Sequence, residues 1–249
     1  MSGKRINRHP WELSRTASLL KEWKPYIASL KRDSEFIDLG AGDMFFDRLV
    51  IGAMPDHTLL AIDLGYEGEK LKYLKKPSSK TKMYKTIEDV GDVQVDYAIM
   101  MDSIEVFPDA LSILKTISSK VKTGGYLFFT MTAFQFLYSD HDRHVNATKR
   151  FNMKEFREIV SLVPEVEIVS MHYFYVSLFF VRLFQKIFRV KIDPDKKVTT
   201  GWRFRQNSII TRIATSILNI DYALCRGLMS LGIQLPGLSL MVICKKVAG

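Results

Sequence analysis

A loop with two glycines, placed directly after an apolar run, constrains this chain more than any other feature. The run 35–39 leads through Asp38 into Gly40 and Gly42. A buried strand, a glycine loop and a helix form a cradle in which backbone N–H groups can approach a ligand closely. A second apolar run ends on Asp63, an acid of the type that accepts hydrogen bonds from two ribose hydroxyls. The pattern predicts a nucleoside site, although glycines in such a loop can also serve only to turn the chain.

The same residues exclude two common phosphate sites. A dinucleotide fingerprint needs Gly or Ala three residues after its second glycine, where this chain has Phe45, and no Gly-Lys-Ser/Thr run is present for a P-loop. Asp38 at the end of the strand suits a positively charged amino group. The predicted ligand is a nucleoside with a cationic or zwitterionic group.

These residues resemble the first motif of the class I S-adenosylmethionine-dependent methyltransferases. That motif is an acid followed by three alternating glycines, and Asp38, Gly40 and Gly42 match it, whereas Met44 replaces the third glycine. Asp63 falls where the family has its ribose-binding acid. The resemblance implies S-adenosylmethionine as the cofactor, with six binding residues: Asp38, Gly40, Gly42, Asp63, Ile87 and Asp102.

Later segments continue the resemblance in the family's order. Residues 95–102 look like the fourth strand, and 122–129 look like the turn and fifth strand. Many relatives carry His where this chain has Val106. The likeness covers about 33–173 and a last strand near 238–245.

Apolar and amphipathic segments alternate along the chain. Strands are expected near 35–39, 58–63, 81–85, 95–101 and 125–132, and helices near 45–53, 67–75, 108–120 and 153–162. The resemblance to the family implies two further strands, at 166–173 and 238–245. This alternation predicts an α/β fold with a doubly wound, mostly parallel sheet. The family implies seven strands with the last antiparallel.

Four regions follow from this reading. Residues 1–32 form a helical segment that Pro25 interrupts, 33–173 the cofactor-binding core, 174–237 a helical insertion, and 238–249 the final strand and tail. The first helix is expected either to lie over the nucleoside cleft or to pack on the sheet edge.

The insertion is basic and aromatic. From 182 to 205 there are eight Lys or Arg and two Asp, within a chain of net charge +9. A helix within 173–190 gathers Arg182, Lys186 and Arg189 on one side and phenylalanines on the rest. This composition is typical of a helix in a membrane interface, and the apolar run is too short to span a bilayer. The alternative is a helix that packs on the domain and whose basic side chains face solvent.

Other sequence features limit the expected cellular location and binding partners of the protein. The first residues lack the apolar core of a signal peptide, so a cytoplasmic protein, peripheral at the inner membrane, is expected. Cys225 and Cys244 have no metal-binding spacing. Nucleic acid is an unlikely partner because the chain shows no nucleic-acid-binding motif. The sequence does not predict the oligomeric state.

The loop after the fifth strand contains the candidate catalytic residues His141, Asp142 and His144. They would orient or deprotonate a methyl acceptor. Two His and one Asp could also bind a metal, but one short loop seldom supplies a full set, so no metal is expected. The expected substrate-contacting residues are Tyr138, Arg150 and Tyr173.

Longer segments resemble one methyltransferase subgroup, which tailors bacterial glycans, lipids and polyketides. They are 134–142, 149–151, 235–239 and 9–12. The extended resemblance, which includes 9–12, suggests enzymes that accompany aryl polyene synthesis and methylate an aromatic head group.

The resulting hypothesis is methyl transfer to a hydroxyl or aromatic carbon of a hydrophobic or carrier-linked small molecule, such as an aryl polyene head group or a lipid or glycan precursor. The alternatives are a non-catalytic nucleoside-binding or membrane-docking module, and an RNA methyltransferase.

Overall fold

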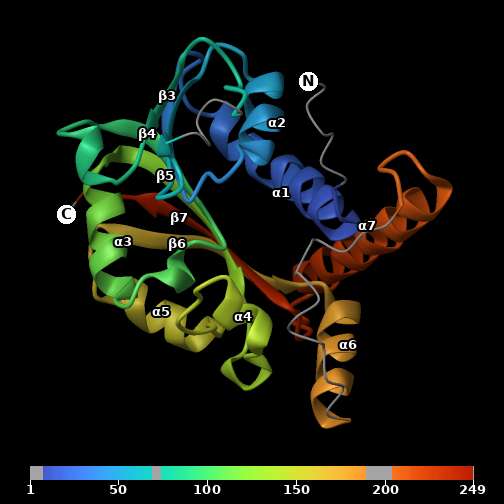
Figure 1. Ribbon diagram of the computed structural model, residues 1–249. Coiled ribbons are helices and arrows are strands. Elements are labelled where there is room, and N and C mark those ends of the chain that lie inside the picture. Colours follow the sequence, from blue (N-terminus) through green and yellow to red (C-terminus); the bar gives the residue numbers. More distant parts are fainter. Residues whose placement is uncertain (1–7, 69–73, 189–203, 249) are drawn as a thin grey trace.

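A computed structural model describes residues 8–68, 74–188 and 204–248. Within these residues one sheet of seven strands has the order β3-β2-β1-β4-β5-β7-β6 (Figure 1). β7 runs antiparallel to β5 and β6, and the other neighbouring pairs are parallel. The strand bounds are β1 Glu35–Leu39, β2 Thr58–Ile62, β3 Thr81–Tyr84, β4 Val95–Met101, β5 Val121–Thr132, β6 Val166–Phe174 and β7 Ser239–Lys246. The doubly wound, mostly parallel sheet expected from the sequence is confirmed.

Helices cover both faces of this sheet. α1, α2 and α7 enclose one apolar cluster, which includes Trp23, Phe46 and Tyr222, while α3 and α5 enclose another with Ile113 and Phe156. The helix bounds are α1 Pro10–Ala28, α2 Phe45–Ala53, α3 Ala110–Ser119, α4 Asp140–His144, α5 Met153–Ser161, α6 Val176–Ile187 and α7 Ile209–Ser230. Because β1, β2 and β4 are buried on both faces, these strands are mostly apolar in sequence.

The expectation that Pro25 interrupts the first helix is wrong, because α1 continues through it to Ala28. A proline inside a helix frees the carbonyl of the residue four positions earlier. Pro25 and Lys21 are both exposed, so water can meet that carbonyl. Residues 69–73, the centre of the helix expected over 67–75, lie outside the described residues.

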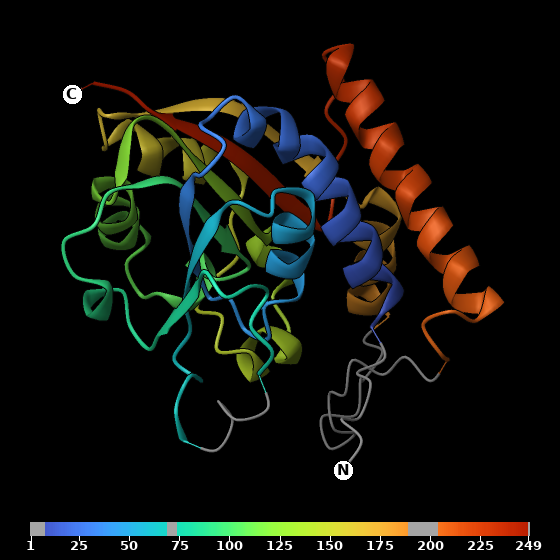
Figure 2. The same ribbon diagram turned by 90° about the horizontal axis from the view of Figure 1, so that it is seen from above.

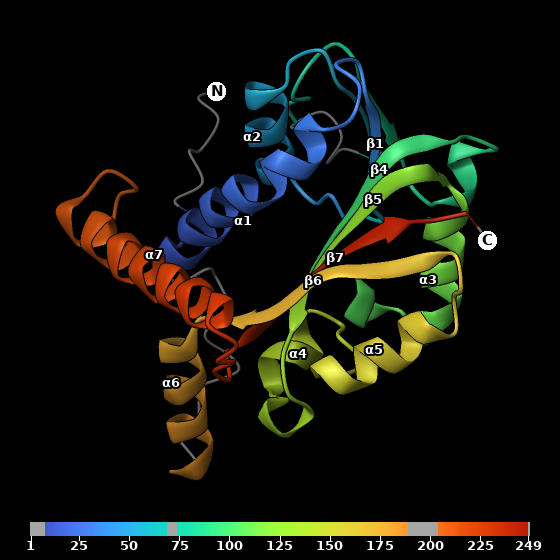
Figure 3. The same ribbon diagram turned by 180° about the vertical axis from the view of Figure 1, so that it is seen from behind.

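The two helices of the insertion extend away from the end of the sheet (Figure 3). α7 packs along α1 (Figure 2). Asp221 of α7 accepts hydrogen bonds from the backbone N–H groups of Val176, at 3.1 Å, and Ser177, at 2.9 Å. A carboxylate at a helix N-terminus satisfies free N–H groups and interacts favourably with the helix dipole, so Asp221 fixes the start of α6.

Candidate functional site

The glycine loop keeps the shape that its motif requires. Gly40 has φ +90°, and a Cβ atom there would lie 2.6 Å from the Cβ of Ser103, so only glycine fits against the segment after β4. Met44 takes φ +57°, in the left-handed region that favours glycine. Its side chain is fully buried in the core between α2 and the sheet. The chain therefore keeps a glycine-like backbone conformation where the resembled motif has its third glycine.

Asp63 connects the glycine loop to the turn after β2. Its Oδ2 accepts a hydrogen bond from the backbone N–H of Gly42 at 3.0 Å, and its Oδ1 accepts one from Gly65 at 2.7 Å. Each carboxylate oxygen has a second lone pair for a further donor. Asp63 thus has the hydrogen-bonding capacity to receive the hydroxyls of a sugar.

A cavity of about 570 Å³ opens at the carboxyl edge of the sheet beside this acid. Gly40, Asp63 and Ile87 contribute to its wall, as does Val106, and the rest is largely apolar. An apolar cleft with a few placed polar groups is the usual form of a small-molecule site. Of the six predicted cofactor residues, Asp38, Gly42 and Asp102 do not line this cavity, but they lie on the segments that adjoin it.

Two buried carboxyl groups lie together beneath the loop. Asp38, at the end of β1, and Asp47, in the first turn of α2, interact electrostatically, and neither oxygen of Asp47 has a hydrogen-bond partner within the described residues. Neither forms an ion pair within the described residues. Burial raises the pKa of both, that of Asp47 to about 7. Two close carboxylates in an apolar setting cannot both ionise easily, so this pair holds a proton at neutral pH.

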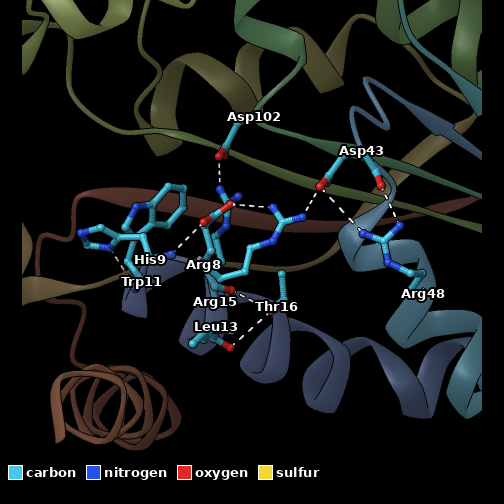
Figure 4. A network of polar contacts seen from close by, with 10 residues as sticks. Arg8, His9, Trp11, Leu13, Arg15, Thr16, Asp43, Arg48 and Asp102 are labelled. Carbon is cyan, nitrogen blue, oxygen red and sulfur yellow. Dashed lines mark hydrogen bonds and ion pairs between the residues drawn. The ribbon is translucent and has the colours of Figure 1, made fainter. Parts of the chain in front are cut away.

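The end of β4 is joined to the first helix by an ion pair. Asp102, which has φ +51°, accepts a hydrogen bond from the Thr130 hydroxyl at 3.0 Å and pairs with Arg15 of α1 (Figure 4). The guanidinium of Arg15 also lies over the ring of Trp11, with 4.2 Å between its Cζ and the ring centroid. This ion pair joins α1, which packs on one face of the sheet, to the end of β4. The expectation that the first helix lies over the nucleoside cleft stays a prediction.

A second arginine of the same end of the chain reaches the glycine loop. Arg8 pairs with Asp43 (Figure 4) and with Glu12. Its Cζ lies 4.2 Å from the ring centroid of Phe45. Asp43 follows Gly42 in the chain and precedes α2. The two arginines therefore connect the N-terminal helix with the loop after β1 and with the end of β4.

Glu105 is a buried carboxyl close to Arg15. Its Oε1 accepts hydrogen bonds from the backbone N–H of Thr132 at 3.1 Å and from the hydroxyl of that residue at 3.2 Å. Its Oε2 has no partner within the described residues. Burial raises the pKa of this carboxyl to about 7. Glu105 therefore interacts electrostatically with Arg15 and is hydrogen-bonded to the end of β5.

The predicted catalytic loop folds around Asp142. Arg150 holds both of its oxygens, and the hydroxyl and backbone N–H of Ser139 donate to Oδ2 at 2.8 Å each. The pKa of Asp142 is lowered despite its burial, mainly through Arg150. A carboxylate with so many donors is a poor proton acceptor, and the geometry suits a role in holding the loop.

Of the other residues predicted in this region, the two histidines are exposed and Tyr138 forms a hydrogen bond within the loop. His141 and His144 are exposed on α4, and partial covering of the ring together with nearby Arg182 lowers the pKa of His141. The Tyr138 hydroxyl donates to the Ala147 carbonyl at 2.7 Å. Their base and substrate roles stay predictions.

Tyr173 lies farther along, on β6. Its hydroxyl accepts from the Met153 N–H at 2.9 Å, and its ring packs on Phe134 with the centroids 4.8 Å apart. No group of three or more His, Cys, Asp or Glu side chains in the described part of the chain is arranged to hold a metal ion.

Sequence reasoning did not identify Arg15, Asp47 and Glu105. Asp47 had a signal, because its spacing to Val50 and Ile51 places it on the buried stripe of a helix. Arg15 had none, since its partner Asp102 is distant in sequence and only the folded chain brings them together.

Comparison with known proteins shows the fold alone. No family model matches the sequence, and no curated protein matches it. A protein assigned as a sarcosine dimethylglycine methyltransferase from Galdieria sulphuraria has a TM-score of 0.60 and 11% identity over 94% of this chain and 86% of that one. The plantazolicin methyltransferase crystallised with S-adenosylhomocysteine (SAH) has a TM-score of 0.56 and 10% identity over 96% of this chain and 85% of that one.

A further similar structure is phosphoethanolamine N-methyltransferase 2 of Haemonchus contortus, in complex with S-adenosylmethionine. Its TM-score is 0.55 with 16% identity over 94% of this chain, which spans 52% of that protein. The sheet order, the glycine loop and these similarities agree, and the chain has the Rossmann-like fold of the class I methyltransferases.

Proposed function

We propose that this protein is an enzyme that transfers a methyl group from S-adenosylmethionine to a small-molecule acceptor. The observation that carries the proposal is the apolar cavity of about 570 Å³ with Asp63 and the glycine loop in its wall. The adenosine would occupy this cavity, with its ribose on Asp63 and its base beside Ile87. Complexes of similar structures with S-adenosylmethionine or SAH support this assignment.

The acceptor would approach from the carboxyl end of β5. Phe134, Tyr173 and Phe179 pack together there, with centroids 4.8 and 5.4 Å from that of Phe134. Such an aromatic wall favours a hydrophobic or carrier-linked acceptor, and an aryl polyene head group or a lipid or glycan precursor fits this description. The protein's own contribution to the reaction is alignment of the acceptor hydroxyl or aromatic carbon with the methyl group.

An oxygen acceptor must also lose its proton. The acceptor oxygen forms a bond to the methyl carbon, the sulfur keeps the electron pair of the broken bond, and the proton passes to a base. We propose His141 or His144 for this role, because a neutral imidazole is a suitable base near pH 7. Asp142 would orient the loop that carries them.

The apolar surface of α6 and α7 supports work at an anionic membrane. Phe180, Phe184 and Ile187 are exposed on α6, together with the cationic Lys186, and α6 contains no acid. α7 exposes a second row of aliphatic side chains: Ile209, Ile210, Ile213, Ile217, Ile220 and Leu224. A helix with aromatic and basic residues binds lipid headgroups and acyl chains together. No helix in the described part of the chain is both long and apolar enough to cross a bilayer.

Binding and turnover are tested separately. Calorimetry with S-adenosylmethionine and SAH should show saturable binding of both, and radiolabelled methyl transfer should appear in a lipid or aryl-carrier extract. Absence of binding at millimolar ligand would refute the proposal. Binding without transfer to any extract fraction would favour a non-catalytic module, whereas label in RNA would favour an RNA methyltransferase.

A further inference from the structure

A second cavity, separate from the one beside Asp63, lies between α1 and α7. Its volume is about 670 Å³, and every residue that lines it belongs to one of these two helices. The two helices run side by side along this contact (Figure 2). The cavity beside Asp63 has a different wall, formed by strand ends, loops and α3. The space between α1 and α7 is therefore a distinct place in which the protein can hold a small molecule.

Glu22 of α1 is the only acid among the described residues that line this second cavity, and other side chains already satisfy it. Its Oε1 pairs with the Nε of Arg226 at 3.1 Å, and its Oε2 accepts a hydrogen bond from the Tyr222 hydroxyl. Both oxygens also lie 3.3 Å from the Nε2 of His172. The side chain of Glu22 is only 6% exposed. A carboxylate with so many partners has little capacity left to bind a cationic ligand.

The hydrogen-bonding groups that remain in the wall favour an anion. Lys21 and Asn219 form no side-chain hydrogen bond or ion pair within the described residues. The side chain of Arg226 is 41% exposed, so part of its guanidinium is accessible beyond the contact with Glu22. The wall contains two cations and one acid that is already paired, which leaves an excess of positive charge. Charge-assisted hydrogen bonds from Lys and Arg are the usual contacts of a phosphate or carboxylate.

The surface next to this cavity is apolar. Ile220 and Leu224 directly follow the lining residues Asn219 and Ala223 along α7, and they are 68% and 55% exposed. Both belong to the row of aliphatic side chains that α7 exposes. A molecule whose anionic group lies between the helices therefore has apolar surface beside it for a hydrocarbon part. This combination matches an anionic amphiphile.

We propose that the cavity between α1 and α7 binds the phosphate headgroup of an anionic phospholipid, whose acyl chains lie on the aliphatic row of α7. The inference rests on the membrane contact proposed above and names the lipid class that this contact selects. The phosphate diester of such a lipid has two free oxygens, which Lys21 and Arg226 can bind together. A soluble phosphate ester has the same headgroup chemistry without the chains. General attraction to a basic surface would depend on net charge alone.

Three soluble probes separate these possibilities. They are dihexanoyl phosphatidylglycerol and dihexanoyl phosphatidylcholine, both kept below the concentration at which they form micelles, and glycerol phosphate. Calorimetry on the full chain measures their dissociation constants without a membrane surface. Phosphatidylglycerol should bind saturably. Phosphatidylcholine, whose headgroup has no net charge, and glycerol phosphate, which lacks the chains, should each bind at least about tenfold more weakly.

Two variants test whether the cavity is the binding site. Lys21→Gln removes one phosphate donor and should weaken phosphatidylglycerol about three- to tenfold, the range for one accessible charge-assisted contact. Ala223→Trp fills the cavity without changing the charge, and it should abolish binding. Lys24→Gln is the matched control, because Lys24 is an exposed lysine of the same helix that does not line the cavity. It removes the same charge and should leave the affinity unchanged.

The inference is overturned if Lys21→Gln and Ala223→Trp bind phosphatidylglycerol as the wild type does, or if Lys24→Gln weakens binding as much as Lys21→Gln. Equal binding of phosphatidylcholine would also overturn it, and equal binding of glycerol phosphate would assign the cavity to a soluble phosphate ester instead of a lipid. Lys21 and Ala223 are exposed, so thermal unfolding of both variants should stay close to that of the wild type. If Ala223→Trp does not fold, the comparison of Lys21→Gln with Lys24→Gln decides. None of these measurements uses S-adenosylmethionine, so their failure would leave the proposed methyl transfer standing.

Discussion

Arg150 binds both carboxylate oxygens of Asp142, with Nε–Oδ1 at 2.9 Å and Nη2–Oδ2 at 3.0 Å. Both side chains are almost completely buried. Arg150 also donates to the Ala133 carbonyl at 3.2 Å, so the pair joins α4 to the end of β5. The segment from Ser139 to Arg150, in which catalysis was predicted, is thus organised around an ion pair.

Asp142→Asn should destabilise the protein by about 3–5 kcal/mol, because it leaves the Arg150 charge buried without its partner. Chemical denaturation measures this change. Asp140→Asn is the control, since Asp140 forms an exposed pair with Arg143 and should change the stability little. A stable Asp142→Asn variant that binds the cofactor but has lost methyl transfer would show that Asp142 acts in catalysis.

Asp63→Ala should lower the affinity for SAH at least tenfold, because it removes a charged acceptor for the ribose hydroxyls and the anchor of the Gly42 N–H. Calorimetry checks this prediction. Asp56→Ala, which removes an exposed acid paired with Arg32, should leave the affinity unchanged. If Asp63→Ala binds SAH within twofold of the wild type, the ribose assignment is wrong.

The buried pair of Asp38 and Asp47 should make stability depend on pH. Its raised pKa values mean that the folded protein binds more protons than the unfolded chain between the ordinary aspartate pKa of 3.8 and about 7. The free energy of unfolding should therefore fall as pH rises through this window, by at most ~1.4 kcal/mol per pH unit for one proton. Glu105 acts in the same direction.

Asp47→Asn tests this expectation, since it retains a side chain of the same shape without the proton equilibrium. Denaturation of both proteins between pH 5 and pH 8 should show a flatter profile for the variant. His172, whose pKa burial lowers to about 4, has the opposite sign, and it contributes equally to both proteins. Identical slopes would mean that the pair holds no proton.

The sequence predicted the parts of the site that depend on local pattern. The loop after β1, the helix from Phe45 to Ala53 and the acid at the end of β2 lie where expected, because each follows from residues close together in the chain. The contacts of Arg15 with Asp102 and of Asp38 with Asp47 depend on packing between elements. A charged residue on a helix gives no indication of which distant acid it will meet, so these relationships required the structure.

The surface of α6 provides a test of membrane binding. Phe180 and Phe184 are more than half exposed, and no acid on α6 opposes an anionic lipid. Replacing both with Ser removes two aromatic side chains that would enter the interface, each contributing about 1.5–3 kcal/mol when fully buried. The bound fraction in flotation with vesicles of phosphatidylglycerol and phosphatidylcholine should fall at least tenfold.

Leu162→Ser is the matched control, because Leu162 is an equally exposed apolar residue at the end of α5. This variant should float like the wild type. Raising the salt concentration should weaken wild-type binding, since the attraction of basic residues to the headgroups is screened. If the wild type remains at the bottom of the gradient, or if the double variant floats as well as the wild type, α6 does not bind membranes.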